Sequence, residues 1–111
     1  ALRGLSLDKT LDNLDSMVHM ARQTGAKVLL LGIQVPPNYG ADYTRRLTQV
    51  YDKIAKERKV ALVPFLLKGV GDAANARQYF QADGIHPNAT AQPIIMRNVL
   101  PELKKVLATV R

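Results

Sequence analysis

Lys27-Val28-Leu29-Leu30-Leu31-Gly32-Ile33 is the stretch that decides the fold class of this chain. It is apolar from Val28 onward instead of alternating, which is the pattern of a strand covered on both faces in a parallel sheet. A second short apolar stretch, Val60 to Phe65, predicts a second buried strand. Two strands are few for a parallel sheet, so the sequence also predicts neighbouring strands that this chain does not supply.

Helical patterns surround these two strands. Apolar residues recur at steps of three and four before the first strand and predict an amphipathic helix that ends at Gly25. A second helix is predicted over 42–59 with Asp42 as its N-cap, and residues 66–82 are predicted to form a loop with a single helical turn. A final helix follows, which Pro101 should kink or split. The order of these elements predicts an α/β fold.

The composition is that of an ordinary globular domain, with 111 residues, 47% apolar and 23% charged. No apolar run approaches the roughly 20 residues of a membrane span, and no signal peptide is visible. The absence of cysteine excludes disulfides and thiolate metal sites. Residues 1–111 therefore have room for one domain with one core, in which Met17 and Met20 are expected to pack.

The net charge of +7 suggests a nucleic-acid partner, so the distribution of the basic residues matters. They are dispersed along the polar sides of the predicted helices. The sequence contains no Lys/Arg run with interleaved aromatics, no zinc-ligand spacing and no RNA-binding signature. A solvated helix face explains the charge equally well, and no nucleic-acid partner is predicted.

Catalytic chemistry is suggested by Asp83-Gly84-Ile85-His86-Pro87-Asn88, which sets a carboxylate and an imidazole three positions apart. A carboxylate on Nδ1–H fixes the tautomer of a histidine, stabilises the imidazolium and leaves Nε2 free to take a proton. Without further context, a helix N-cap followed by a surface histidine is the commoner explanation. A metal site lacks a third ligand at suitable spacing. His19 is expected to be structural or solvent-facing.

The local sequence resembles a known enzyme family. Asp83 to Pro87 resembles the D-x-x-H-P block of SGNH hydrolases, also called the GDSL esterase/lipase family. Gln34 to Gly40, Val63 to Phe65 and Asp83 to Pro93 are similar, in order and spacing, to its bacterial acyl-CoA thioesterase, lysophospholipase and arylesterase branch.

This resemblance implies a three-layer α/β/α sandwich of the flavodoxin-like SGNH type, with this chain holding the last two strands of the parallel sheet. It also implies that Asp83 is the orienting carboxylate and His86 the general base of a Ser-His-Asp ester or thioester hydrolase that needs neither cofactor nor metal.

The chain departs from the family pattern at the nucleophile. The family carries its serine in a G-D-S block and its oxyanion-hole Gly and Asn elsewhere in the N-terminal part. Ser6 and Ser16 lie in no such block, and Gly71-Asp72-Ala73 has alanine in the place of serine. Ala1 to Gly4 resembles the stretch just after the G-x-N-D block. The chain is thus expected to be a C-terminal portion, inactive alone, with an N-terminal fragment carrying the serine as its partner.

The same resemblance implies an acyl ester or thioester substrate and a periplasmic or secreted location in bacteria. Substrate contacts are expected at Leu2, Arg3, Gly4, Val35, Pro36 and Ile85. The sequence leaves the acyl chain length and the leaving group open. The alternative function is a non-catalytic interaction fragment that pairs through its exposed sheet edge.

Overall fold

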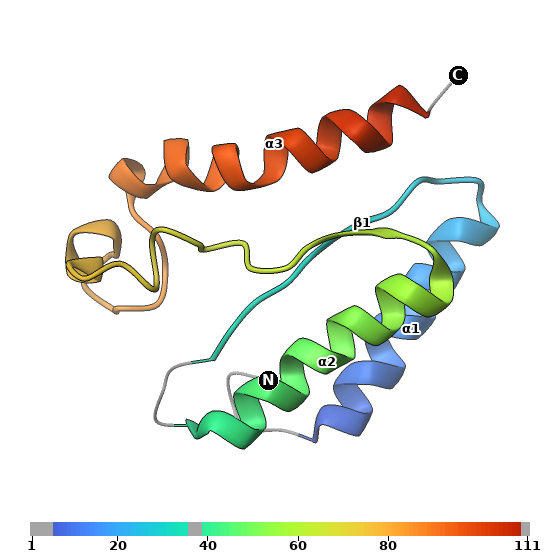
Figure 1. The fold of residues 1–111 in the computed structure, drawn as a ribbon, viewed down its shortest axis with the longest axis horizontal. Coiled ribbons are helices and arrows are strands. Elements are labelled where there is room, and N and C mark those ends of the chain that lie inside the picture. Colours follow the sequence, from blue (N-terminus) through green and yellow to red (C-terminus); the bar gives the residue numbers. More distant parts are fainter. Residues whose placement is uncertain (1–5, 36–38, 110–111) are drawn as a thin grey trace.

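The structure, a computed structural model, describes residues 6–35 and 39–109. In chain order its elements are α1 (Leu7–Gln23), β1 (Leu29–Leu31), α2 (Ala41–Arg58), β2 (Ala61–Val63), the short 3₁₀ helices η2 (Ala76–Tyr79) and η3 (Ala89–Ala91), and α3 (Gln92–Ala108). The α1 and α2 helices pack side by side on one face of the sheet and α3 covers the other (Figure 1). The predicted α/β fold is confirmed.

The two strands pair in parallel, with Leu30 opposite Leu62 and α2 as the connection between them. Gly32 follows β1 and lies so close to the other strand that a Cβ there would stand 2.2 Å from the carbonyl oxygen of Pro64. Its N–H donates to Val63 at 2.8 Å, and its carbonyl accepts from Leu66 at 2.8 Å. A side chain at position 32 would therefore separate the two strand ends.

The prediction that β1 is covered on both faces is wrong at Leu31, which is 38% exposed. Leu30 packs with residues of α1 and α2 in the core, so its neighbours along the strand point to the opposite face. Within residues 6–35 and 39–109, α3 covers that face only partly, and β1 has no strand on its outer side. This exposure agrees with the expectation of additional neighbouring strands.

The main core lies between α1, α2 and β1. Leu47 and Ile54 of α2 are almost wholly buried there, together with Val18 of α1. The α1 helix ends as predicted, with Gly25 at φ +86°, a conformation that favours glycine.

The start of α2 corrects the sequence prediction, because the N-cap is Gly40. Asp42 instead lies in the first turn of the helix and pairs with Arg45. A carboxylate in the first turn interacts favourably with the amino end of the helix without capping it.

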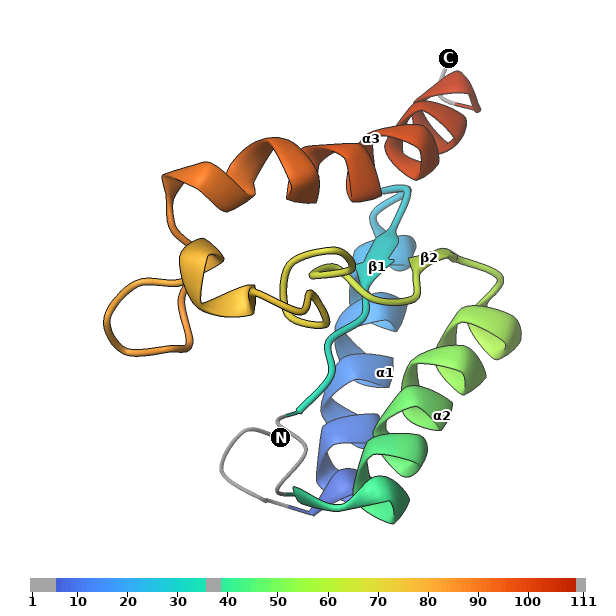
Figure 2. The same ribbon diagram turned by 60° about the vertical axis from the view of Figure 1, so that its left-hand side comes forward.

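The α3 helix continues through Pro101 without splitting and bends in its C-terminal half (Figure 2).

Met17 and Met20 are exposed on α1, so the prediction that they pack in the core is wrong within the described part of the chain. They lie on a different side of the helix from Leu14 and Val18, which face the core. No helix among the described residues is long and apolar enough to cross a membrane.

Candidate active site

Asp83 and His86 form a direct side-chain pair. The distance from His86 Nδ1 to Asp83 Oδ2 is 2.5 Å. The other carboxylate oxygen, Oδ1, accepts from the backbone N–H groups of Ile85 at 2.9 Å and His86 at 3.0 Å. Both oxygens of the carboxylate are thus engaged within one turn of chain, and the imidazole is held against it as the sequence predicted.

These hydrogen bonds determine the charge state of the pair. The side-chain bond from His86, assisted by the two backbone N–H groups, lowers the pKa of the Asp83 carboxyl from 3.8 to about 2. The carboxylate is therefore ionised at neutral pH and can only accept, so the proton between the two groups belongs to Nδ1. In the neutral imidazole this leaves the lone pair on Nε2, which is the arrangement of a general base.

The pair faces solvent. The side chain of His86 is 69% exposed and that of Asp83 41%. Among the described residues, Nε2 of His86 has no hydrogen-bond partner. An exposed base with a free lone pair can reach a group that approaches from outside the described chain.

The loop that carries the pair is closed by a short antiparallel pairing. Phe80 forms a bridge with Pro87, and the backbone N–H of Gln81 donates to the carbonyl of His86 at 2.8 Å. Gly84 turns the chain at φ +69°, a value that few other residues adopt readily. The loop therefore returns on itself and directs the side chain of His86 outward.

The helix cap that the sequence offered as the commoner explanation is found at a different residue. Asn88 is the N-cap of η3, with its side chain accepting from the N–H of Ala91 at 3.3 Å. Asp83 lies inside the loop, between the paired residues Phe80 and Pro87, and caps none of the described helices. The sequence reasoning did not assign a role to Asn88, although an Asn directly before a helix is a capping signal.

The serines lie elsewhere on the chain. Ser6 precedes α1, and Ser16 is exposed within it. In Figure 1 the α1 helix lies on one side of the sheet, while the chain around residues 80–90, in orange, lies beyond the far end of the strands. The hydrogen bonds of the described residues join neither serine to His86.

Of the predicted substrate contacts, Leu2, Arg3, Gly4 and Pro36 lie outside the described residues. Val35 is only 7% exposed and packs in the main core, so within the described part of the chain it does not line an open groove. Ile85 is exposed directly beside His86, where an apolar side chain can meet a substrate. The roles of all these residues stay predictions.

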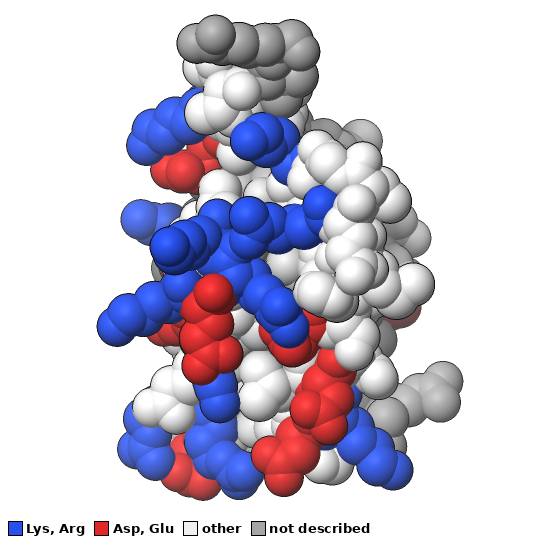
Figure 3. Space-filling view, turned by 90° about the vertical axis from the view of Figure 1, so that its right-hand side faces the viewer, with Lys and Arg blue, Asp and Glu red and all other residues white. Residues whose placement is uncertain are grey.

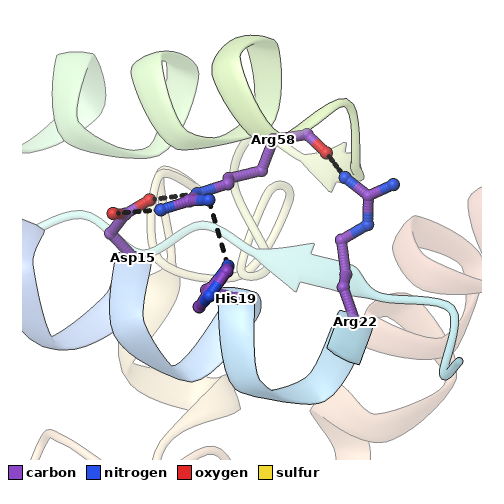
Figure 4. Close-up of polar contacts among 4 residues, drawn as sticks. All are labelled: Asp15, His19, Arg22 and Arg58. Atoms are coloured by element: carbon purple, nitrogen blue, oxygen red, sulfur yellow. Dashed lines mark hydrogen bonds and ion pairs between the residues drawn. The ribbon is translucent and has the colours of Figure 1, made fainter. Parts of the chain in front are cut away.

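His19 belongs to a second polar cluster, which joins the C-terminal ends of α1 and α2 (Figure 4). Arg58 binds both oxygens of Asp15 at 2.7 and 2.8 Å, and its Nη1 lies 3.2 Å from His19 Nδ1. Arg22 donates to the carbonyl of Arg58. Since a guanidinium can only donate, Nδ1 of His19 must accept. His19 is exposed, as the sequence predicted, and it contacts the Asp15–Arg58 ion pair.

Basic side chains gather at the end of the molecule where the strands begin, although acidic ones lie among them (Figure 3). A groove there is lined by Arg22, Lys27, Lys59 and Lys105, with Glu102 as its acidic member. This end also holds the C-termini of the three long helices, where cations are stabilised by the helix dipoles. No cluster of three or more metal-binding side chains occurs within residues 6–35 and 39–109.

Comparison with known proteins shows a family match over most of the chain. The model of the GDSL-like Lipase/Acylhydrolase family matches residues 1–93. Esterase TesA of Pseudomonas aeruginosa is 51% identical over 106 residues, which cover 96% of this chain and 51% of the relative. Thioesterase 1/protease 1/lysophospholipase L1 of Escherichia coli is 38% identical over 94 residues, covering 85% of this chain and 44% of that protein.

Solved structures agree with this match. A crystal structure of TesA superposes with a TM-score of 0.87 at 50% identity, covering 95% of this chain and 57% of the TesA chain. The psychrotrophic esterase EstA from Pseudoalteromonas sp., inhibited by monoethylphosphonate, gives a TM-score of 0.84 at 30% identity, covering 97% and 57%. The chain spans about half the length of the curated relatives it matches, and it corresponds to the C-terminal part of TesA. It is thus a partial SGNH hydrolase fold.

Proposed function

This chain belongs to the GDSL-like lipase/acylhydrolase family, and we propose that Asp83 and His86 are the carboxylate and the general base of a serine hydrolase mechanism. The observation that carries this proposal is the 2.5 Å contact between His86 Nδ1 and Asp83 Oδ2. It is supported by the exposure of the imidazole and by the absence of a partner for Nε2 among the described residues.

The proposed reaction is the hydrolysis of a carboxylic ester or thioester. Nε2 of His86 takes the proton of a serine hydroxyl as the serine oxygen attacks the acyl carbonyl carbon. The imidazolium, stabilised by Asp83, then gives that proton to the departing alcohol or thiol. Water attacks the acyl-serine with the same base assisting, and the acid and the free serine are released.

The serine and the oxyanion-hole Gly and Asn are proposed to come from a segment outside these residues. Three features support an additional segment: the open outer side of β1, the exposed Leu31, and the exposed Met17 and Met20 on α1. The relatives are about twice as long as this chain, which leaves room for further strands and helices in them. A parallel strand beside β1 would pair its free backbone groups and cover Leu31.

Substrate contacts are proposed at Ile85 on the His86 loop, at Leu2, Arg3 and Gly4, and at Pro36 after β1. Val35, which is buried in the main core, is not among them. Ile85 is exposed directly beside His86, and residues that follow a strand lie at the sheet end where open α/β sheets bind ligands. The names of the relatives, an esterase and a thioesterase/lysophospholipase, support acyl esters and thioesters as the substrate class.

A non-catalytic role is the second candidate, and the open side of β1 is the observation in its favour. In that case the edge recruits a strand from another protein and the Asp83–His86 pair has no chemical role. The two functions differ in whether supplying the missing half of the fold creates a hydrolase.

The test joins the N-terminal part of Pseudomonas aeruginosa TesA, which this chain does not match, to residue 1. Hydrolysis of p-nitrophenyl acyl esters is then measured for the joined protein and for the 111-residue chain alone. The proposal expects turnover by the joined protein and only background hydrolysis by the chain. Turnover by the chain alone that is lost in His86→Ala would contradict an external serine. An inactive but folded joined protein would favour the interaction fragment.

A further inference from the structure

We infer that Asn88 is a positioning residue, which holds the loop that carries His86 in place relative to residues 78–80 and to α3. This inference rests on the proposed role of His86 as general base and extends it to a residue that touches neither the substrate nor the imidazole. Asn88 lies two residues after His86, at the junction between the catalytic loop and η3.

Asn88 bonds to the opposite side of the loop through both its backbone and its side chain. Its N–H donates to the carbonyl of Tyr79 at 2.8 Å, and its Nδ2 donates to the carbonyls of Gln78 at 2.7 Å and Phe80 at 3.3 Å. Three consecutive carbonyls of the incoming chain are therefore bound by one residue. Asn88 acts as a clamp across the base of the loop.

The other end of this clamp is fixed to α3. The Oδ1 atom of Asn88 accepts from the N–H of Ala91, and the backbone carbonyl of Asn88 accepts from the same N–H at 3.2 Å. Ala91 is fully buried and directly precedes α3. The side chain of Gln92 adds a bond to the Asn88 carbonyl at 3.2 Å. Asn88 thus joins the segment after His86 to the buried start of the neighbouring helix.

The hydrogen bonds of Asp83 cannot serve this purpose. All three of them end on Ile85 or His86, within the same turn of chain. They shape the turn, but they do not fix it relative to the sheet or to α3. Next to the clamp, Gln81 supplies further links across the loop: its backbone N–H donates to the His86 carbonyl at 2.8 Å, and its side chain donates to the Pro87 carbonyl at 3.5 Å.

Asn98 offers a matched control. Its Nδ2 also donates to two carbonyls of a distant segment, Leu66 at 2.9 Å and Lys68 at 2.8 Å. It lies on α3 and anchors the loop after β2, away from the Asp83–His86 turn. Asn98→Ala therefore removes the same kind of clamp without touching the base of the catalytic loop.

The experiment measures hydrogen exchange of the Gln81 N–H, which donates to the His86 carbonyl across the loop, by NMR of the full chain at neutral pH. The variants are Asn88→Ala, Asn88→Asp and Asn98→Ala. Asn88→Asp keeps the oxygen that caps η3 but loses both Nδ2 donors at that pH. In the parent chain this N–H is expected to be protected from exchange, because its hydrogen bond joins the two sides of the loop.

Both Asn88 variants should raise the exchange rate of the Gln81 N–H by about tenfold, the factor that corresponds to one net hydrogen bond. Asn98→Ala should leave this rate unchanged. A parent-like exchange rate in Asn88→Asp would overturn the inference, as would an equal rise in Asn98→Ala. The readout needs no enzymatic activity, so it is independent of whether the proposed function holds.

Discussion

The packed half of the molecule and the catalytic loop are held together by different forces. In the half made of α1, α2 and the sheet, Leu47 and Ile54 are buried among aliphatic side chains from three elements. In the loop from Asp83 to His86 every residue is exposed, and the conformation depends on hydrogen bonds. The burial of apolar side chains stabilises a fold but does not depend on the direction of each contact. Hydrogen bonds depend on distance and angle, so they fix the geometry of a few atoms.

The difference separates stability from chemistry in this chain. Substitutions in the packed half should change the free energy of unfolding, since each buried side chain there removes apolar surface from water. Substitutions in the loop should change the geometry and charge of the Asp83–His86 pair with a small effect on global unfolding, because little surface is buried there. Three substitutions test this separation.

The largest effect is expected from Leu47→Ala. Leu47 is fully buried between the helices, and truncating such a leucine lowers the free energy of unfolding by about 2–5 kcal/mol through lost burial and a residual cavity. Denaturant unfolding followed by circular dichroism measures the loss. Leu107→Ala, at an exposed position of α3, is the control and should stay within about 0.5 kcal/mol of the parent. Equal losses in the two variants would contradict the assignment of the core.

A smaller loss is expected from Gly32→Ala, at the point where the sheet meets the loops. The new Cβ would stand 2.2 Å from the Pro64 oxygen, so the backbone must move, at a cost of about 1–3 kcal/mol. Gly71→Ala is the matched control, because the nearest atom to its Cβ is a flexible Phe65 carbon at 3.5 Å. Thermal melts of both variants provide the comparison. A parent-like melting temperature for Gly32→Ala would mean that the strands tolerate separation.

The smallest effect on global unfolding is expected from Asp83→Asn. The folded-state pKa of Asp83 is about 2, below its ordinary value of 3.8, so the stabilisation is complete above about pH 5 and is lost as the pH falls toward 2. The variant should lack this acid-dependent loss and should melt slightly below the parent at pH 7, because it lacks the stabilisation that the parent loses in acid; the difference is small because the pair is exposed. A carbon NMR titration of the Asp83 carboxyl measures the midpoint directly. A midpoint at the ordinary value would show that the pair does not form in solution.

The sequence predicted the fold well where periodicity and burial coincide. The stripes of α1 and α2, the glycine that ends α1 and the two parallel strands follow from residue spacing and match the structure. The sequence prediction failed where the burial of an apolar side chain depends on elements outside the described residues. Leu31, Met17 and Met20 are exposed because nothing among the described residues covers them, and an apolar residue alone cannot reveal its neighbour.

The Asp83–His86 pair could be predicted from the sequence, whereas the hydrogen bonds that hold its loop in place could not. An Asp and a His three positions apart before a turn were enough to expect the pair, and the structure brings them together. The bonds of Asn88 to Gln78, Tyr79 and Phe80 depend on a pairing between two irregular segments, which has no periodic signal in sequence. Val35 was expected at a substrate groove, but its burial in the core depends on how the chain leaves β1.

The most direct measurement compares the two histidines of this chain in the protein completed by the N-terminal part of TesA. The kcat/KM for a p-nitrophenyl ester is determined for His86→Ala and for His19→Ala. We expect a loss of about 10²–10⁴-fold for His86→Ala, the usual contribution of a general base. His19→Ala, on the exposed side of α1, should stay within about twofold of the parent. Equal rates for the two variants would contradict the assignment of His86 as the base.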